Sequence, residues 1–289
     1  MDVRKILVPL SGRFDPEDSD SLDAPAIQTA LRLARHLGAR LEVMSVTGPV
    51  GPQTGGWVSW LPEYGIDAVL ASIEKQGAAR RKRARKTFDA IIAADTASDT
   101  LQATFVENAG EISAAVGSAG RLSDLIVVAN SESRWEQPFR PILDAALRQT
   151  GRPIFVTPPS APEKTGQHIA IAWNDTPQSA RALAGAMPLL KRADSVTVLT
   201  CREGDEASER ADPDKVVDFL KLHGVTARRH ILDARHRDVA RGIIDASLSE
   251  GADLLVLGSV IHSRVQSLVF GSLTEEVLKA PRLSALLVP

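Results

Sequence analysis

The sequence predicts an α/β protein made of two tandem five-stranded parallel-sheet domains, each doubly wound, that pack together as a pseudo-dimer. Short apolar runs alternate with helical patterns along the whole chain, which is typical of parallel strands covered by helices on both faces. The pattern also occurs twice, because Asp124–Asn130 (DLIVVAN) and Asp253–Ser259 (DLLVLGS) are near-copies. An internal repeat of this length indicates two versions of one domain.

Five strands are expected in the first half, apolar on both parities because both faces of a parallel sheet are covered. They fall near Ile6–Pro9, Leu41–Val46, Gln102–Val106, Leu125–Ala129 and Ile154–Val156. Between them, apolar residues recur with the helical period. These segments predict helices over roughly Ala24–His36, Asp67–Ala94, Glu111–Ala119 and Pro138–Gln149.

The second half repeats this order of elements. Its strands are predicted near Ile169–Ala172, Ser195–Cys201, Thr226–Ile231, Leu254–Leu257 and Ala285–Val288. Its helices are predicted over roughly Pro177–Lys191, Pro213–His223, Asp238–Ser249 and Gly271–Lys279. Both halves close on an apolar strand that ends in proline, Pro158 in one and Pro289 in the other.

The proline-rich segment Pro158–Gly166 joins the two halves, because three prolines and a glycine cannot continue a strand or a helix. We therefore predict domains at residues 1–158 and 167–289, joined by a linker at 159–166. A second irregular segment, Thr47–Gly65, contains four glycines before the aromatic residues Trp57 and Trp60. We interpret it as a surface loop anchored by its aromatic side chains, although lids also have this length.

The composition excludes several classes of protein. With 44% hydrophobic and 24% charged residues in 289, the chain has the make-up of a soluble globular protein. A formal net charge of −2 predicts no general attraction to nucleic acid or to anionic membranes. The single cysteine, Cys201, excludes an internal disulfide. Because no signal peptide or membrane-spanning run is apparent, we expect a cytoplasmic location.

A basic run, Arg80–Lys86 (RRKRARK), is the strongest concentration of charge. Such a run can indicate a nucleic-acid patch. On a helix, however, seven consecutive residues span about two turns and surround most of the axis. Without interleaved aromatic residues, the run predicts a solvated helix face instead.

The segment from Asp253 to Ser272 has the features of a phosphate site. A buried strand ends in Gly258, a loop that contains Arg264 follows, and Gly271-Ser272 begins a helix. Backbone N–H groups at a helix N-terminus attract anions. Structural explanations exist for the same residues, because Gly258 could simply end a strand. The sequence Ser272–Glu275 also fits a helix capping box.

These residues resemble the universal stress protein family in its tandem two-domain form, and the resemblance covers essentially the whole chain. It includes the family's ATP pattern, in which two residues separate a first and a second glycine, and nine residues separate the second from a glycine followed by serine or threonine. The pattern maps onto Gly258, Ile261, Gly271 and Ser272, so the spacing is retained and Ile261 replaces one glycine.

The resemblance implies a Rossmann-like fold with a nucleotide across the carboxyl ends of the strands. The implied nucleotide-binding residues of the second half are Asn174, Val196, Gly258, Ile261, Arg264, Gly271 and Ser272. In the first half, Ser11 stands in place of Asn174, Ala129 stands in place of Gly258, and the loop Asn130–Pro141 contains no glycine. That half is interpreted as a degenerate partner domain.

The resemblance implies a stress-response module that binds ATP or another adenine nucleotide, with Mg²⁺ as an accompanying ion. Family members commonly pair their fifth strands, here Ile154–Val156 with Ala285–Val288, and a homodimer is a further expectation. An alternative is an interaction or dimerisation protein that keeps the architecture and has lost the ligand. A slow ATP hydrolase is a third hypothesis, although no residue set supplies a nucleophile or an activated water.

Overall fold

The computed structural model describes residues 2–12, 21–46, 63–97, 101–108, 110–130, 139–202, 211–233, 239–259, 271–279 and 283–289, with residues 63–70 and 73 described by their backbone alone. The strands of the first half are β1 (Lys5–Leu10), β2 (Arg40–Val46), β3 (Ala103–Asn108), β4 (Leu125–Ala129) and β5 (Ile154–Thr157). Those of the second half are β6 (His168–Ala172), β7 (Ser195–Arg202), β8 (Ala227–Asp233), β9 (Leu254–Gly258) and β10 (Ser284–Val288).

The helices alternate with these strands, as the sequence predicts. The first half contains α1 (Ala24–Leu37), α3 (Glu63–Ala94), α4 (Ile112–Arg121) and α5 (Phe139–Gln149). The second half contains α6 (Pro177–Leu190), α7 (Pro213–Leu222), α8 (Val239–Ser249) and α9 (Ser272–Lys279). In the part of the chain that the structure describes, no helix is both long and apolar enough to span a bilayer.

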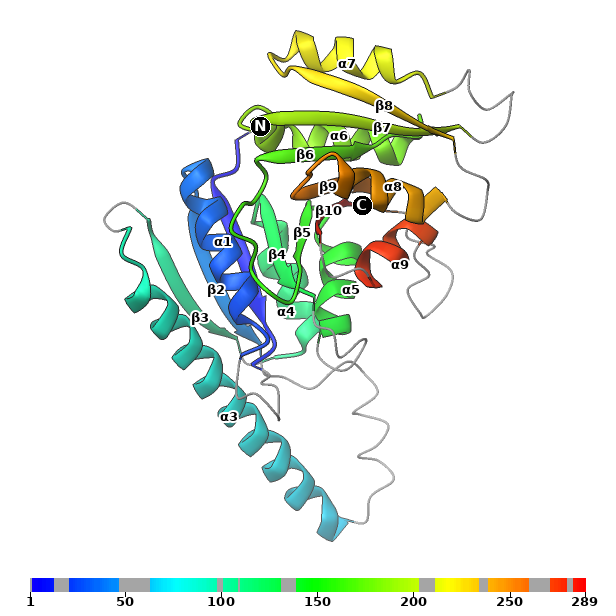
Figure 1. The fold of residues 1–289 in the computed structure, drawn as a ribbon. Helices are drawn as coiled ribbons and strands as arrows, with labels where there is room; N and C mark the ends of the chain where they lie inside the picture. The colour runs from blue at the N-terminus through cyan, green and yellow to red at the C-terminus, as the bar shows by residue number, and fades with distance from the viewer. Residues whose placement is uncertain are drawn as a thin grey trace.

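The described strands form one continuous ten-stranded sheet in the order β3-β2-β1-β4-β5-β10-β9-β6-β7-β8 (Figure 1). Within each half all neighbouring strands are parallel, and the junction between β5 and β10 is antiparallel. The two predicted five-stranded sheets are therefore present, and they are joined edge to edge. Pairing of the fifth strands is confirmed.

The register at this junction has two-fold pseudo-symmetry. Phe155 pairs with Leu286, and each residue occupies the same place in its own half, opposite Val127 of β4 and Val256 of β9. Both side chains are fully buried. Since the halves meet across a pair of equivalent residues, the tandem chain reproduces the arrangement of a symmetric dimer, and the predicted pseudo-dimer is confirmed.

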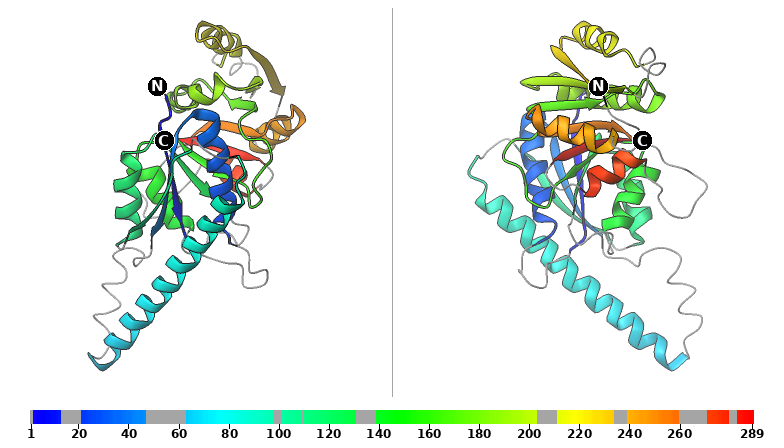
Figure 2. Two further views of the ribbon diagram at one scale, coloured as in Figure 1. Left: turned by 90° about the vertical axis from the view of Figure 1, so that its left-hand side faces the viewer. Right: turned by 45° about the vertical axis from the view of Figure 1, so that its right-hand side comes forward.

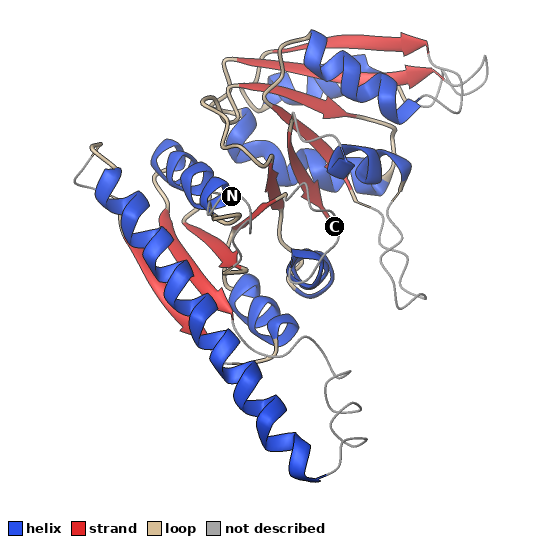
Figure 3. Ribbon diagram, turned by 60° about the horizontal axis from the view of Figure 1, so that its bottom comes forward, coloured by secondary structure: helices blue, strands red, loops and turns tan. Residues whose placement is uncertain are grey.

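Helices cover both faces of the sheet (Figures 2 and 3). One apolar core contains residues of α1, α3, α6 and α7, and the other contains residues of α4, α5, α8 and α9. Each core receives side chains from both halves of the chain. Residues 158–167, where the linker is predicted, form neither helix nor strand.

The aspartate that opens each near-copy has a structural role. Asp253 precedes β9, and its carboxylate accepts hydrogen bonds from the backbone N–H groups of Gly166, Gln167 and His168 at 2.7, 3.0 and 3.1 Å. Asp124 does the same for Arg4 and Lys5 at 2.9 and 3.0 Å. Each carboxylate binds backbone N–H groups at or just before the start of the first strand of its own half, β1 or β6. This shared structural role explains why the aspartate occurs in both copies.

Helix α3 begins earlier than predicted and extends well beyond the sheet in every view (Figures 1, 2 and 3). Its later part packs on α1, β2 and β3, with Ala84 and Phe88 buried. Lys82 and Lys86 are exposed. The basic run therefore contributes to a solvated helix face, as expected. The rest of the predicted loop Thr47–Gly65, including Trp57 and Trp60, lies outside the described residues.

Candidate functional site

The strand order of the second half reverses between β6 and β9. The chain leaves β6 toward α6 on one face of the sheet and leaves β9 toward α9 on the other. Such a reversal opens a crevice at the carboxyl ends of parallel strands, where ligands of doubly wound sheets bind. Asn174 follows β6 and Gly258 ends β9, so the structure brings these two predicted residues to neighbouring strand ends.

The loop after β6 is short and well braced. Thr176 caps α6, its hydroxyl accepts a hydrogen bond from the Ser179 N–H at 3.2 Å, and Pro177 occupies the first helical turn. The Thr176 hydroxyl also donates to Asn174 Oδ1 at 2.7 Å. Asn174 is exposed, and no described contact engages its amide nitrogen. That nitrogen is thus available to donate a hydrogen bond to a ligand.

Asp175 lies in the left-handed region at φ 54°, the only described non-glycine residue with positive φ. Aspartate tolerates this conformation better than most residues, yet the cost is still about 1 kcal/mol. Its position at the switch point, beside Asn174, agrees with the tendency of such strain to occur at ligand sites.

Gly258 has a packing role that the sequence does not reveal. A Cβ atom at this position would lie 2.5 Å from the carbonyl carbon of Gln178 and 2.6 Å from its oxygen. Gln178 belongs to the first turn of α6, which lies across the end of β9. The glycine is therefore required for helix–sheet contact whether or not a phosphate binds nearby.

Gly271 and Ser272 lie at the start of α9. The carbonyl of Gly271 accepts the Glu275 N–H at 3.0 Å, so Gly271 caps the helix and Ser272 is its first residue. The capping-box alternative for Ser272 and Glu275 is therefore wrong. A Cβ at Gly271 would meet nothing within 4 Å. The first-turn N–H groups of α9 lack helical acceptors, as in any helix, and can face an anion.

Val196 does not lie with the other predicted nucleotide-binding residues at the carboxyl edge of the sheet. It pairs with Ile169 near the amino end of β7 and is 3% exposed. At about 3.3 Å per residue it lies roughly 10 Å short of the level of Leu199 at the carboxyl edge. We correct the prediction: Val196 is a core residue. Ile261 and Arg264 lie outside the described residues.

Thr200 was missed by sequence reasoning. It lies at the carboxyl end of β7, one residue beyond Leu199, whose carbonyl accepts the Trp173 N–H at 2.9 Å. Its side chain is 3% exposed, and its hydroxyl has no hydrogen-bond partner among the described residues. Ser45 has the same place on β2 and likewise lacks a partner in the part of the chain that the structure describes. An unpaired buried hydroxyl is costly, so Thr200 is a candidate ligand contact. Because Ser45 has the same property, this hydroxyl does not distinguish the two halves.

The equivalent edge of the first half is filled by the protein's own groups. The buried Asp23 carboxylate accepts hydrogen bonds from the Ser11 N–H, the Ser11 hydroxyl and the Gly12 N–H at 2.9, 2.8 and 2.6 Å. A Cβ at Gly12 would lie 2.7 Å from the Arg80 carbonyl oxygen of α3. Among the described residues, no carboxylate engages the loop at Asn174 in this way.

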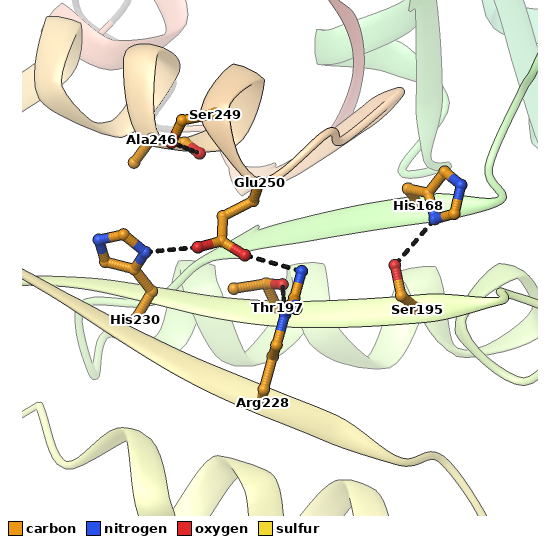
Figure 4. A network of polar contacts seen from close by, with 8 residues as sticks. All are labelled: His168, Ser195, Thr197, Arg228, His230, Ala246, Ser249 and Glu250. Carbon is orange, nitrogen blue, oxygen red and sulfur yellow. Dashed lines mark hydrogen bonds and ion pairs between the residues drawn. The ribbon is translucent and has the colours of Figure 1, made fainter.

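A separate polar cluster lies where the end of α8 meets β7 and β8 (Figure 4). Glu250, just after α8, accepts hydrogen bonds from His230 Nδ1 at 2.7 Å and from Arg228 at 2.8 Å. Arg228 also donates to the Thr197 hydroxyl at 3.1 Å. The cluster connects α8 to the edge strand β8. Among the described residues no group of three or more His, Cys, Asp or Glu side chains could hold a metal ion.

Comparisons with known proteins agree with this architecture. Residues 166–289 match the sequence profile of the universal stress protein family. A universal stress protein from Archaeoglobus fulgidus superimposes with a TM-score of 0.68 at 13% identity, covering 98% of this chain and 97% of that one. A family relative from Pseudomonas aeruginosa superimposes with a TM-score of 0.55 at 14% identity, covering 99% and 93%. No functionally curated protein matches the chain.

Proposed function

Because residues 166–289 form a universal stress protein domain and the whole chain has the fold of the family's two-domain members, we propose that this protein is a stress-response module whose C-terminal half binds an adenine nucleotide. The ligand would lie at the carboxyl edge between β6 and β9. The N-terminal half would serve as a partner domain without a nucleotide of its own.

A contrast between equivalent edges carries this proposal. In the second half the Asn174 amide nitrogen and the first turn of α9 have no described partners. In the first half the Asp23 carboxylate already engages Ser11 and Gly12. Open donors at a switch point suit a base and an anionic phosphate chain, and the family resemblance favours adenine.

Isothermal titration with ATP tests the proposal. Asn174→Ala and the isosteric Thr200→Val should each weaken binding about fivefold or more, because each removes one hydrogen bond to the ligand. Ser45→Val removes the equivalent hydroxyl of the first half and should leave the affinity unchanged. The same loss in Ser45→Val as in Thr200→Val would contradict placement of the ligand in the second half.

An interaction protein without a ligand is the second candidate, and the packing of Gly258 against Gln178 favours it, since this glycine needs no nucleotide to explain it. The absence of binding heat with wild-type protein, together with its appearance in Ile261→Gly, would support this candidate. Phosphate release above background that disappears in Ser272→Ala would instead support slow hydrolysis.

A further inference from the structure

One buried hydrogen bond connects the end of β4 in the first half to helix α9 in the second. Asn130 follows β4 and is 8% exposed. Its backbone N–H donates to Thr157 of β5 at 2.8 Å. Its side-chain Nδ2 donates to the carbonyl oxygen of Leu278 at 2.7 Å.

The acceptor lies in the last turn of α9, where backbone carbonyls have no partner inside the helix. Asn130 thus caps α9 from the other domain. Helix α5, the counterpart of α9, is held from within its own half. There the Thr150 hydroxyl donates to the Ala146 carbonyl at 2.5 Å, and the Arg121 guanidinium donates to the Gln149 carbonyl at 3.1 Å.

This hydrogen bond has no counterpart at the position that the pseudo-symmetry makes equivalent, among the residues that the structure describes. Ser259 stands where Asn130 stands, and its N–H donates to Val288 of β10 at 2.9 Å as the Asn130 N–H does to Thr157. The Ser259 side chain is 2% exposed, and its hydroxyl has no hydrogen-bond partner among the residues that the structure describes. Serine is too short to repeat the bond that asparagine makes, so among the described residues the second half has no equivalent side-chain bond from this position to α5.

Helix α9 has only eight residues, about 12 Å in length. A short helix with its last carbonyls anchored has little freedom to move its first turn. Leu278 and Val277 are buried against the sheet, while the first residue, Ser272, is exposed. The anchored end and the end that faces the candidate anion site are therefore the two ends of one rigid segment.

We infer that Asn130 is a positioning residue for the anion-binding end of α9, so that the N-terminal half, which lacks an open site, sets the geometry of the site in the C-terminal half. This inference rests on the proposed nucleotide function for its consequence, and on the Asn130–Leu278 contact for its mechanism. It assigns the degenerate domain a role beyond covering one edge of the sheet.

Hydrogen exchange of the full chain, combined with ATP titration, tests the inference. Asn130→Ser installs the residue of the equivalent position, and Asn130→Asp keeps the shape while replacing the donor by an acceptor. Both should speed amide exchange in α9 about fivefold, the factor that corresponds to one lost hydrogen bond. Both should weaken ATP binding by a similar factor, while exchange in α5 stays at its wild-type rate.

Arg192→Gln is the matched control. Arg192 donates to the carbonyl of His36 at the end of α1, so this variant also removes a side-chain bond between the halves, but one that does not touch α9. It should change neither α9 exchange nor ATP affinity. Unchanged α9 exchange in the Asn130 variants, an equal rise throughout both halves, or faster α9 exchange at full ATP affinity would each overturn the inference. If the wild type takes up no ATP, the proposed function fails by itself, and α9 exchange alone decides whether Asn130 holds this helix.

Discussion

Replacing Gly258 by alanine should destabilise the fold, and the expected size follows from the contact with α6. The new Cβ would lie 2.5 Å from the Gln178 carbonyl carbon, whereas ordinary contacts begin at 3.4 Å. The first turn of α6 and the end of β9 must therefore separate by about 0.9 Å, or one of them must deform. Overpacking of this kind costs about 1–3 kcal/mol.

Equilibrium unfolding in urea measures this cost, because the midpoint should fall while the dependence on urea concentration stays unchanged. A thermal midpoint lower by roughly 2–10 °C is the corresponding result for domains of this size. Gly271→Ala is the control. Its Cβ would meet nothing within 4 Å, so no overpacking arises, and only the poorer N-capping by alanine should lower stability, by about 1 kcal/mol or less.

The two glycines therefore separate packing from ligand binding. If Gly258→Ala keeps wild-type stability and loses only ATP affinity, the packing argument is refuted and the glycine serves the phosphate. If Gly271→Ala lowers ATP affinity at unchanged stability, the start of α9 lies against the ligand.

Three further predictions concern stability. Asp253→Ala should lower the free energy of unfolding by about 3 kcal/mol, and more than Asp124→Ala does, because three backbone N–H groups lose their acceptor instead of two; chemical denaturation of both variants checks the order. Burial first, and the Arg192 guanidinium second, lower the pKa of His36 from 6.5 against an opposing effect of Asp194. Since the folded protein binds this proton less readily than the unfolded chain, the stabilising contribution is complete above pH 6.5 and is lost as the pH falls through the lowered pKa. The urea midpoint should thus drop less in His36→Gln than in the wild type between about pH 7.5 and about pH 5, and parallel curves would refute the assignment. Gly12→Ala should destabilise the first half by 2 kcal/mol or more, to order of magnitude, because φ is +65° and the Arg80 carbonyl lies 2.7 Å from the new Cβ; a thermal midpoint equal to that of the wild type would contradict this.

The repeat in the sequence was enough to predict the architecture. Because Asp124 and Asp253 open equivalent strands, their recurrence marked the two halves, and the structure gives both carboxylates the same backbone partners. Pairing of β5 with β10 was implied by the family resemblance, and the structure confirms it with two fully buried strands. The order of helices and strands and the division into two halves can thus be predicted from local sequence patterns and the repeat, without knowing any side-chain contact.

The details of the site depended on register and packing, which a linear pattern does not contain. Val196 and Thr200 lie on the same strand and the same face, and only the pairing with β6 shows that Thr200 reaches the carboxyl edge. Gly258 matched a phosphate motif, but its contact with Gln178 required α6 to be placed in space. Nothing in the sequence predicted the contact of Asn130 with α9, because the repeat shows only that Asn130 and Ser259 occupy equivalent positions.

At the carboxyl edge of the first half, several packed residues contact one another. Asp23 engages Ser11 and Gly12, and Gly12 in turn lies against the backbone of Arg80 in α3. Exchanging Ser11 for asparagine would therefore not open this edge, because the carboxylate and the helix would remain. In the second half the glycine motif departs from the family pattern only at Ile261. Among the described residues, no carboxylate binds the loop after β6 as Asp23 binds Ser11 and Gly12. Ile261→Gly should consequently strengthen ATP binding in the C-terminal half, whereas Ser11→Asn should create no second binding event, and a titration stoichiometry of two for Ser11→Asn would show that the first edge is open after all.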